Sequence, residues 1–271
     1  MGNTEPSNTE PFNTEPSGPE RPAHPHPESA VGLVNLWRVS GVADEATDTW
    51  LRLDVPEFQL WRACGMITGK WRASAGLFLA TVFGASAQCV AVGTVPTVPW
   101  LESVTGHRAT AAGWELTGAT GERIATLTVD GAPTPVPAAA DAYTAPPPVT
   151  AETRAALGRP VTLPVGAVPA TAADLTGRWV PADLDAPTEP FVRFDADGSW
   201  TGSDGCNGNA GRWAVSGSGE ILATSGMSTM MFCEGAPVPS WVAQARLAVL
   251  DGGGLRLLAP DGAPLGRLER G

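Results

Sequence analysis

The chain has 271 residues, 43% of them hydrophobic, and a formal net charge of −11. This length suits two domains, since a typical domain takes roughly 100 to 200 residues, and the hydrophobic fraction is ample for packed cores. The acidic balance argues against nucleic acid or an anionic membrane as partner, because phosphate contacts need Lys or Arg and the only lysine is Lys70. No apolar run reaches the roughly 20 residues that span a bilayer.

Residues 1–30 repeat Asn-Thr-Glu-Pro and then become rich in proline. A segment with almost no aliphatic side chains cannot offset the entropy lost on ordering, so we predict a disordered tail. His24 and His26 on such a flexible segment make a poor metal site. The N-terminus also lacks the basic region, apolar segment and cleavage site of a secretory signal.

Residues 31–131 share an order of characteristic residues with residues 171–271. The matched pairs are Trp37 with Trp179, Cys64 with Cys206, Trp71 with Trp213, and Cys89 with Cys233. A period of about 140 residues is too long for a solenoid, so we predict a tandem domain duplication. The first copy is the more divergent, because Ala63-Cys64-Gly65 stands where the second has Gly-Cys-Asn.

The segment between the copies, residues 132–170, begins with a stretch rich in Pro and Ala that favours an extended, semi-rigid spacer. Thr150 is suited to cap a short helix that ends near Leu157. Residues 160–165 read as an extended arm lying on one domain.

Hairpin signals dominate the second copy. Residues 191–195 alternate apolar and polar before the turn residues Asp197-Gly198, and residues 255–258 and 265–268 flank Asp261-Gly262 in the same way.

One helix is predicted in each copy. In the second it runs from Trp241 to about Leu250, with Ser240 as its cap, and ends at the glycines 252–254. The first copy has a shorter equivalent from Trp100 to Val104.

The four cysteines fall two in each half at similar separations, which favours Cys64–Cys89 and Cys206–Cys233 bonds over cross-domain pairing. Such bonds indicate an oxidising compartment. Because no signal segment is evident, either one is missing from this version of the sequence, as we favour, or the cysteines are reduced thiols of a cytosolic protein.

Residues 202–213 form the most distinctive stretch, reading Gly-Ser-Asp-Gly-Cys-Asn-Gly-Asn-Ala-Gly-Arg-Trp. Gly205, Asn207 and Gly211 indicate a shaped loop, because Gly and Asn enter left-handed conformations at least cost. Together with Leu-Thr-Gly-Arg-Trp at 175–179 and Thr-Met-Met-Phe-Cys at 229–233, the stretch resembles the HslJ-like META domain family.

The resemblance covers residues 171–271, with residues 31–130 as a divergent copy. It implies a small antiparallel barrel-like sheet with one helix, found mostly in bacterial envelope or stress-related proteins, and no known catalysis.

Candidate chemical groups have simpler structural explanations. His107, the only histidine outside the tail, is expected at the surface, and Asp195, Asp197 and Asp204 suit turns better than a calcium site. The ten tryptophans are expected in cores rather than on a ligand platform. The methionines are expected in a packed strand rather than around copper; they are Met227, Met230 and Met231.

The sequence therefore predicts a mainly β (α+β) protein of two tandem antiparallel barrel-like sheets joined by a Pro-rich linker. We expect no catalytic residues, cofactor or metal, a monomer, and a protein or apolar ligand as partner. The expected function is a non-enzymatic binding or stability factor of the bacterial envelope or stress response. Two alternatives stay open: a secreted inhibitor-like protein, which needs a rigid protruding loop, and a carrier of an apolar ligand inside the barrel.

Overall fold

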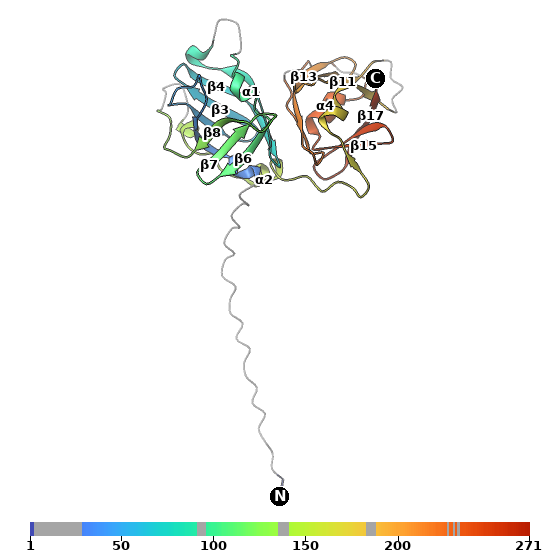
Figure 1. Ribbon diagram of the computed structural model, residues 1–271, viewed down its shortest axis with the longest axis horizontal. Helices are drawn as coiled ribbons and strands as arrows, with labels where there is room; N and C mark the ends of the chain where they lie inside the picture. Colours follow the sequence, from blue (N-terminus) through green and yellow to red (C-terminus); the bar gives the residue numbers. More distant parts are fainter. Residues whose placement is uncertain are drawn as a thin grey trace.

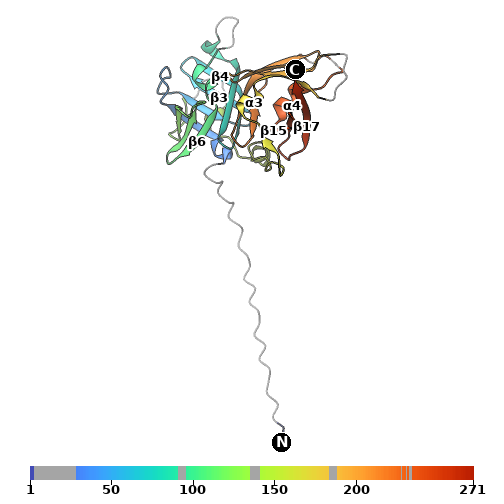
Figure 2. The same ribbon diagram turned by 45° about the vertical axis from the view of Figure 1, so that its right-hand side comes forward.

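The structure is a computed structural model. It describes residues 1–2, 29–90, 96–134, 141–182, 188–226, 228–229, 231 and 234–271. The tail predicted to be disordered lies almost entirely outside these ranges. The described chain is mainly β, with two antiparallel sheets that lie side by side, as the sequence predicts (Figure 1, Figure 2).

The first sheet is a closed barrel, which we call the N-terminal barrel. Its strands pair in chain order, and β1 also pairs with β8 to complete the ring. The strands are β1 Asn35–Ser40, β2 Trp50–Leu53, β3 Glu57–Arg62, β4 Gly65–Ser74, β5 Leu77–Ala85, β6 Gly106–Thr110, β7 Gly113–Thr117 and β8 Arg123–Thr128. Three short helices accompany them, η1 Ala30–Leu33, η2 Ala87–Cys89 and α1 Pro99–Glu102.

The second sheet, which we call the C-terminal sheet, has the order β14-β13-β12-β11-β10-β17-β16-β15-β9. Its strands are β9 Val168–Pro169, β10 Gly177–Pro181, β11 Phe191–Phe194, β12 Ser199–Ser203, β13 Gly208–Val215, β14 Ile221–Ala223, β15 Leu247–Asp251, β16 Gly254–Leu258 and β17 Pro264–Arg270. Its helices are α3 Ala172–Leu175 and α4 Val238–Gln244, while η3 Asp141–Thr144 and α2 Ala151–Ala156 belong to the linker. A bridge between Glu220 and Leu247 brings β14 and β15 together.

The predicted hairpins form for the expected reasons. Val192 and Phe194 in β11 are fully buried whereas Arg193 is exposed, so the strand has one core face and one solvent face. Gly198 closes the β11–β12 turn with a positive φ of 81° and donates its N–H to the Asp195 carbonyl.

The same tryptophan contacts occur in both sheets. Trp37 Nε1 donates to the Leu33 carbonyl at 2.7 Å, and Trp179 Nε1 donates to the Leu175 carbonyl at 2.7 Å. In both cases the acceptor is the last residue of the helical turn directly before the strand that holds the tryptophan, β1 or β10. Each bond ties that turn to its core.

A second pair of tryptophans makes matching bonds, to the residue after β2 and to the residue after β11. Trp71 Nε1 donates to the Asp54 carbonyl at 2.6 Å, and Trp213 Nε1 donates to the Asp195 carbonyl at 3.1 Å. All ten tryptophans of the chain are buried or partly buried.

Gly69 and Gly211 lie two residues before Trp71 and Trp213. At each glycine a neighbouring aromatic ring leaves no room for a side chain. A Cβ on Gly69 would come within 2.3 Å of the Phe58 ring, and one on Gly211 within 2.8 Å of the Trp200 indole nitrogen and 1.9 Å of the Thr224 carbonyl oxygen. No side chain fits either position without displacing backbone.

The predicted helix from Trp241 to about Leu250 is wrong in position. Helix α4 begins at Val238. Pro239 fits its first turn because proline has no backbone N–H, and N–H groups in the first turn have no acceptor within the helix. Ser240 lies inside the helix instead of capping it. Ala245 leaves the helix with ψ 140°, and the following residues form strand β15. Burial decides the outcome, because Leu247–Val249 are buried while paired with β16.

The linker also differs from the predicted spacer, because its described parts pack on the sheets. Tyr143 contacts the Trp50–Trp61 cluster, and Leu157, which follows a helix capped by Thr150 as predicted, joins the barrel core. Farther along, Val161 N–H donates to the Pro260 carbonyl at 2.9 Å. The described parts of the linker are therefore held by contacts with the two sheets and do not form a free, extended spacer. The predicted domain boundaries stay a prediction.

The predicted bond between Cys64 and Cys89 is present, with a Cα–Cα separation of 4.8 Å. Replacing both cysteines by Ala should lower the free energy of unfolding by about 3 kcal/mol, because the bond closes a loop of 25 residues in the unfolded chain. Urea unfolding of the double variant and the oxidised wild type measures this difference. An equal free energy of unfolding in the two oxidised proteins would contradict this contribution.

Candidate functional site

The Gly-Cys-Asn loop is held by the carboxylate of Asp204. Its Oδ1 accepts N–H bonds from Cys206 at 2.9 Å and Asn207 at 2.6 Å. Burial opposes ionisation of Asp204, but hydrogen bonds from Asn207 and Cys206 outweigh it and lower the pKa of the carboxyl group. The carboxylate thus shapes the turn.

Asn207 connects this loop to the segment that follows β14. Its side chain is buried, donates Nδ2 to the Met231 carbonyl at 2.8 Å, and accepts at Oδ1 from the Thr229 hydroxyl and the Met231 N–H, both at 2.8 Å. Nδ2 also donates to Asp204 Oδ2 at 2.9 Å. The amide is therefore saturated by structural contacts.

Gly205 and Cys206 lie in the turn that Asp204 holds. Gly205 has a φ of +102°, the left-handed conformation that its position in the sequence indicates. Cys206 is not a free thiol, but Cys233 lies outside the described residues, so their pairing stays a prediction.

The packed methionine strand predicted here is wrong for Met231. Its side chain is 61% exposed in an irregular segment, because Asn207 instead of a neighbouring strand satisfies the Met231 backbone. Met227 and Met230 lie outside the described residues.

Asp197 stabilises the turn between β11 and β12. Its Oδ1 accepts from the Ser199 N–H at 2.8 Å and the Ser199 hydroxyl at 2.6 Å, which lowers the pKa of this exposed carboxyl group. Asp195 accepts at Oδ1 from Arg193 Nε at 2.8 Å. Within the described ranges, no group of three His, Cys, Asp or Glu side chains could hold a metal ion.

The prediction that His107 is a surface residue is wrong. His107 lies on β6 with 7% of its surface exposed, and its ring meets Trp114 edge-on at a centroid distance of 5.2 Å. Neither ring nitrogen has a hydrogen-bond partner among the described residues. Burial lowers the pKa of His107 to about 4, so the imidazole is neutral at pH 7.

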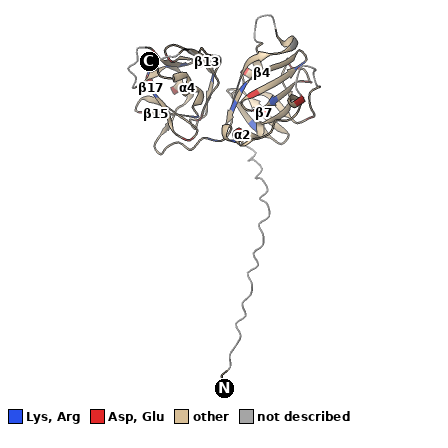
Figure 3. Ribbon diagram, turned by 180° about the vertical axis from the view of Figure 1, so that it is seen from behind, with Lys and Arg blue, Asp and Glu red and all other residues tan. Residues whose placement is uncertain are grey.

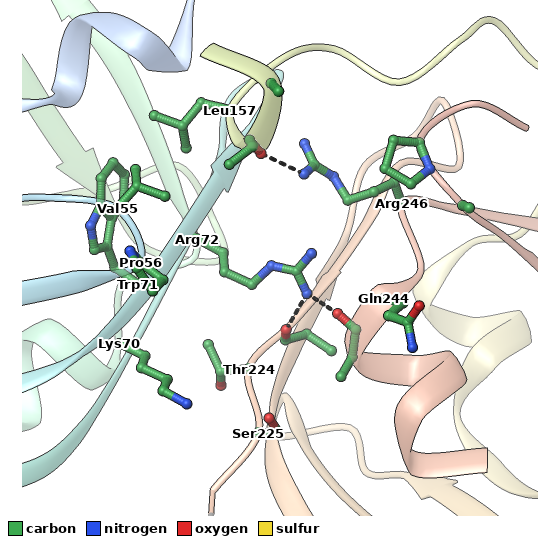
Figure 4. A pocket seen from close by; sticks show the side chains of 16 residues that line it. Val55, Pro56, Lys70, Trp71, Arg72, Leu157, Thr224, Ser225, Gln244 and Arg246 are labelled. Atoms are coloured by element: carbon green, nitrogen blue, oxygen red, sulfur yellow. Dashed lines mark hydrogen bonds between the residues drawn. The ribbon is translucent and has the colours of Figure 1, made fainter. Parts of the chain in front are cut away.

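A cavity of about 400 Å³ lies where the two sheets meet. Strand β4 lines one side of it, and β14, the end of α4 with Arg246 after it, and the end of α2 line the others (Figure 4). Arg72 crosses this junction, and its Nη1 donates to the Ala223 carbonyl at 2.8 Å and to the Ala243 carbonyl. From the other side, Arg246 donates to the carbonyls of Ala156 at 2.9 Å and Gly158 at 3.1 Å.

Neighbouring contacts keep the two sheets together. The hydroxyls of Thr81 and Thr224 lie 2.7 Å apart, and the Ser74 hydroxyl donates to Glu220 at 3.3 Å. The sequence gives no signal for this cavity, because its two arginines lie in different halves of the chain and neither belongs to a recognisable motif.

Residues 171–269 match the family model of the META domain. This range agrees closely with the range of the resemblance, and it covers somewhat more than a third of the chain. No curated protein and no solved structure matches the chain. In the part of the chain that the structure describes, no helix is long and apolar enough to cross a membrane.

The saturated amide of Asn207 predicts a large effect of its removal. Asn207→Ala should lower the free energy of unfolding by about 2 to 4 kcal/mol, because buried donors and acceptors on both segments lose their partners. Chemical denaturation measures the change. Asn209→Ala is the matched control, since among the described residues the Asn209 side chain accepts only from the adjacent Ala210 N–H, and an equal loss in both variants would contradict this role.

His107 predicts a pH dependence of stability. Its pKa is lower in the folded than in the unfolded chain, so the unfolded chain binds more protons between about pH 4 and 6.5, and stability falls as the pH is lowered through that window. From pH 7 to 4.5 the loss due to His107 should be about 2 to 3 kcal/mol. Urea unfolding at both pH values should show that His107→Phe lacks this part of the loss, and an identical pH dependence in the two proteins would contradict it.

Proposed function

We propose that this protein, which carries a META domain at residues 171–269, is a non-enzymatic ligand-binding protein of an oxidising compartment such as the bacterial cell envelope. It consists of two diverged copies of one fold, and the ligand occupies the cavity between them. The observation that carries the proposal is the cavity of about 400 Å³ to which both sheets contribute, a volume within the range of small-molecule sites.

The order of elements supports the duplication. From η1 and from α3 onward, each half has a helical turn, five strands, a helix, which η2 precedes in the N-terminal half, and three further strands, and the strand after the helical turn pairs with the last one. The shared hydrogen bonds of Trp37 with Trp179, and of Trp71 with Trp213, lie at corresponding points of this order. Since fold alone does not give function, these matches support common architecture and not a shared ligand.

The filled barrel supports a site between the sheets. Large side chains of the N-terminal barrel are fully buried in one core cluster, among them Leu51, Leu53, Phe58 and Leu60. A ligand therefore has room at the junction instead of inside the barrel, where the alternative of an apolar-ligand carrier had it.

The chemistry of the candidate residues supports a non-enzymatic role. His107 is buried and unprotonated at pH 7, and Asp204 is engaged in holding its own loop. Among the described residues that line the cavity, Lys70, Thr224 and Ser225 are of the types that can act as nucleophiles, but no histidine or carboxylate lies beside them to act as a general base.

The Cys64–Cys89 bond supports an oxidising compartment, because disulfides rarely persist in the cytosol. The bacterial envelope is such a compartment, and it is where the family resemblance points.

Filling the cavity tests the function. Ala156→Trp places a large ring in the cavity from the exposed face of α2, whereas Glu152→Trp changes the same helix at a position that does not line it. In a thermal-shift screen with a library of small metabolites, ligands that raise the melting temperature of the wild type should also do so for Glu152→Trp. They should fail with Ala156→Trp.

Equal shifts in both variants would contradict a ligand site at this cavity. Turnover in a broad hydrolase and oxidoreductase screen, abolished by changing His107 or Asp204, would contradict the non-enzymatic role.

A further inference from the structure

The cavity between the sheets is basic although the chain is acidic. Among the described residues, Lys70, Arg72 and Arg246 line it and no Asp or Glu does, whereas the whole protein carries a net charge of −11. Elsewhere acidic and basic residues are interspersed over the strands of the barrel (Figure 3). The single-sign lining is therefore a local property of the junction.

Arg72 has donor capacity left inside the cavity. Its Nη1 is committed to the Ala223 and Ala243 carbonyls, but Nε and Nη2 have no hydrogen-bond partner among the described residues. Figure 4 shows the guanidinium in the middle of the cavity, with its second Nη directed toward the side from which Arg246 enters. Three N–H groups, one on Nε and two on Nη2, thus remain for an acceptor.

Arg246 faces the same space with its charge uncompensated inside the cavity. It is only 4% exposed, and the two carbonyls it binds, those of Ala156 and Gly158, are neutral. Its Nε is buried without a partner in the described structure. Glu220 is the acidic residue whose charge acts on it, and this carboxylate lies outside the cavity lining.

The two guanidinium groups act unfavourably on each other. Burial, and then the charge of Arg246, lower the pKa of Arg72 to about 10, and burial also lowers the pKa of Arg246. Both stay protonated at neutral pH. Two buried like charges without an acid between them are costly, and an anion bound between them removes that cost.

The remaining wall decides what kind of anion fits. Apolar groups of Val55, Pro56, Leu157 and Pro260 line the cavity beside the arginines. A volume of about 400 Å³ exceeds the need of an inorganic ion and suits a molecule with an apolar body.

We propose that the cavity binds a small organic anion, with its carboxylate or phosphate group between Arg72 and Arg246 and its apolar body against the wall formed by Val55, Leu157 and Pro260. This inference rests on the proposed ligand-binding function and specifies the ligand class. Guanidinium groups are well suited to it, because they pair with carboxylate and phosphate through two parallel N–H bonds.

Isothermal titration calorimetry with matched probes tests the inference on the full chain. Hexanoate and hexanamide share one apolar body and differ in charge, so hexanoate should bind about tenfold more tightly or better. Hexyl phosphate and inorganic phosphate separate the possible anions. Tighter binding of hexyl phosphate than hexanoate assigns a phosphate ligand, the reverse assigns a carboxylate, and inorganic phosphate should bind more weakly than hexyl phosphate.

Variants locate the binding. Arg246→Gln and Arg72→Gln should each weaken binding of the preferred anion about tenfold or more, and Arg246→Lys should retain part of the affinity because it keeps the charge. Arg256→Gln is the matched control, since Arg256 is exposed on the same sheet and pairs with Asp251, and its affinity should equal that of the wild type. Near-ultraviolet circular dichroism checks that each variant is folded.

The outcomes separate this inference from the function it rests on. Equal binding of hexanoate and hexanamide, both lost in Ala156→Trp, would keep a ligand site at the junction and overturn its preference for anions. Failure of both anions to bind at millimolar concentration would overturn the inference, as would anion binding unchanged in folded Arg72→Gln and Arg246→Gln.

Discussion

The guanidinium of Arg72 is the group on which the arrangement of the two sheets depends. It extends from β4 and donates to one carbonyl at the end of β14 and another in α4. Hydrogen bonds from a charged donor contribute about 1.5 to 3 kcal/mol each, and these two join parts of the chain that no covalent constraint brings together. The other polar contacts of the junction are those of Thr81 with Thr224 and of Ser74 with Glu220, and the bonds of Arg246 to the linker.

The same junction also holds the linker in place. Arg246 binds the carbonyls at the end of α2, while Leu157 enters the barrel core. The linker is thus fixed from both sides, and its carbonyls form one wall of the cavity. Residues from the two sheets and the linker are all needed to define the site, which makes it a property of the full chain.

Within each sheet, much could be predicted from the sequence because the signals are local. The Asp197-Gly198 turn, the alternation before it and the cap at Thr150 all depend on neighbouring residues, and the structure has them as predicted. The helix at Trp241 was displaced because Leu247–Val249 is apolar enough for a helix or a strand. Only pairing with β16 decides between the two.

The rest could not be predicted, because it depends on contacts between distant residues. His107 is buried by its place on β6 beside Trp114, although the sequence predicts it at the surface. The candidate site follows the same rule. Gly205 and Asn207 were identified from their own motif, whereas Arg72 and Arg246 become neighbours only when the two sheets dock.

Strand β9 has a consequence for the solubility of the protein. Its two residues pair with Val249 and Leu250 of β15, and Ala170 N–H donates to the Ala248 carbonyl at 3.0 Å. Leu163 and Ala167 pack on the same side. An uncovered strand edge recruits other chains, and a proline-containing edge strand is poorly suited to extend a sheet further. The linker therefore protects β15 from edge-to-edge aggregation, and a fragment that starts after Ala170 would expose that strand to self-association.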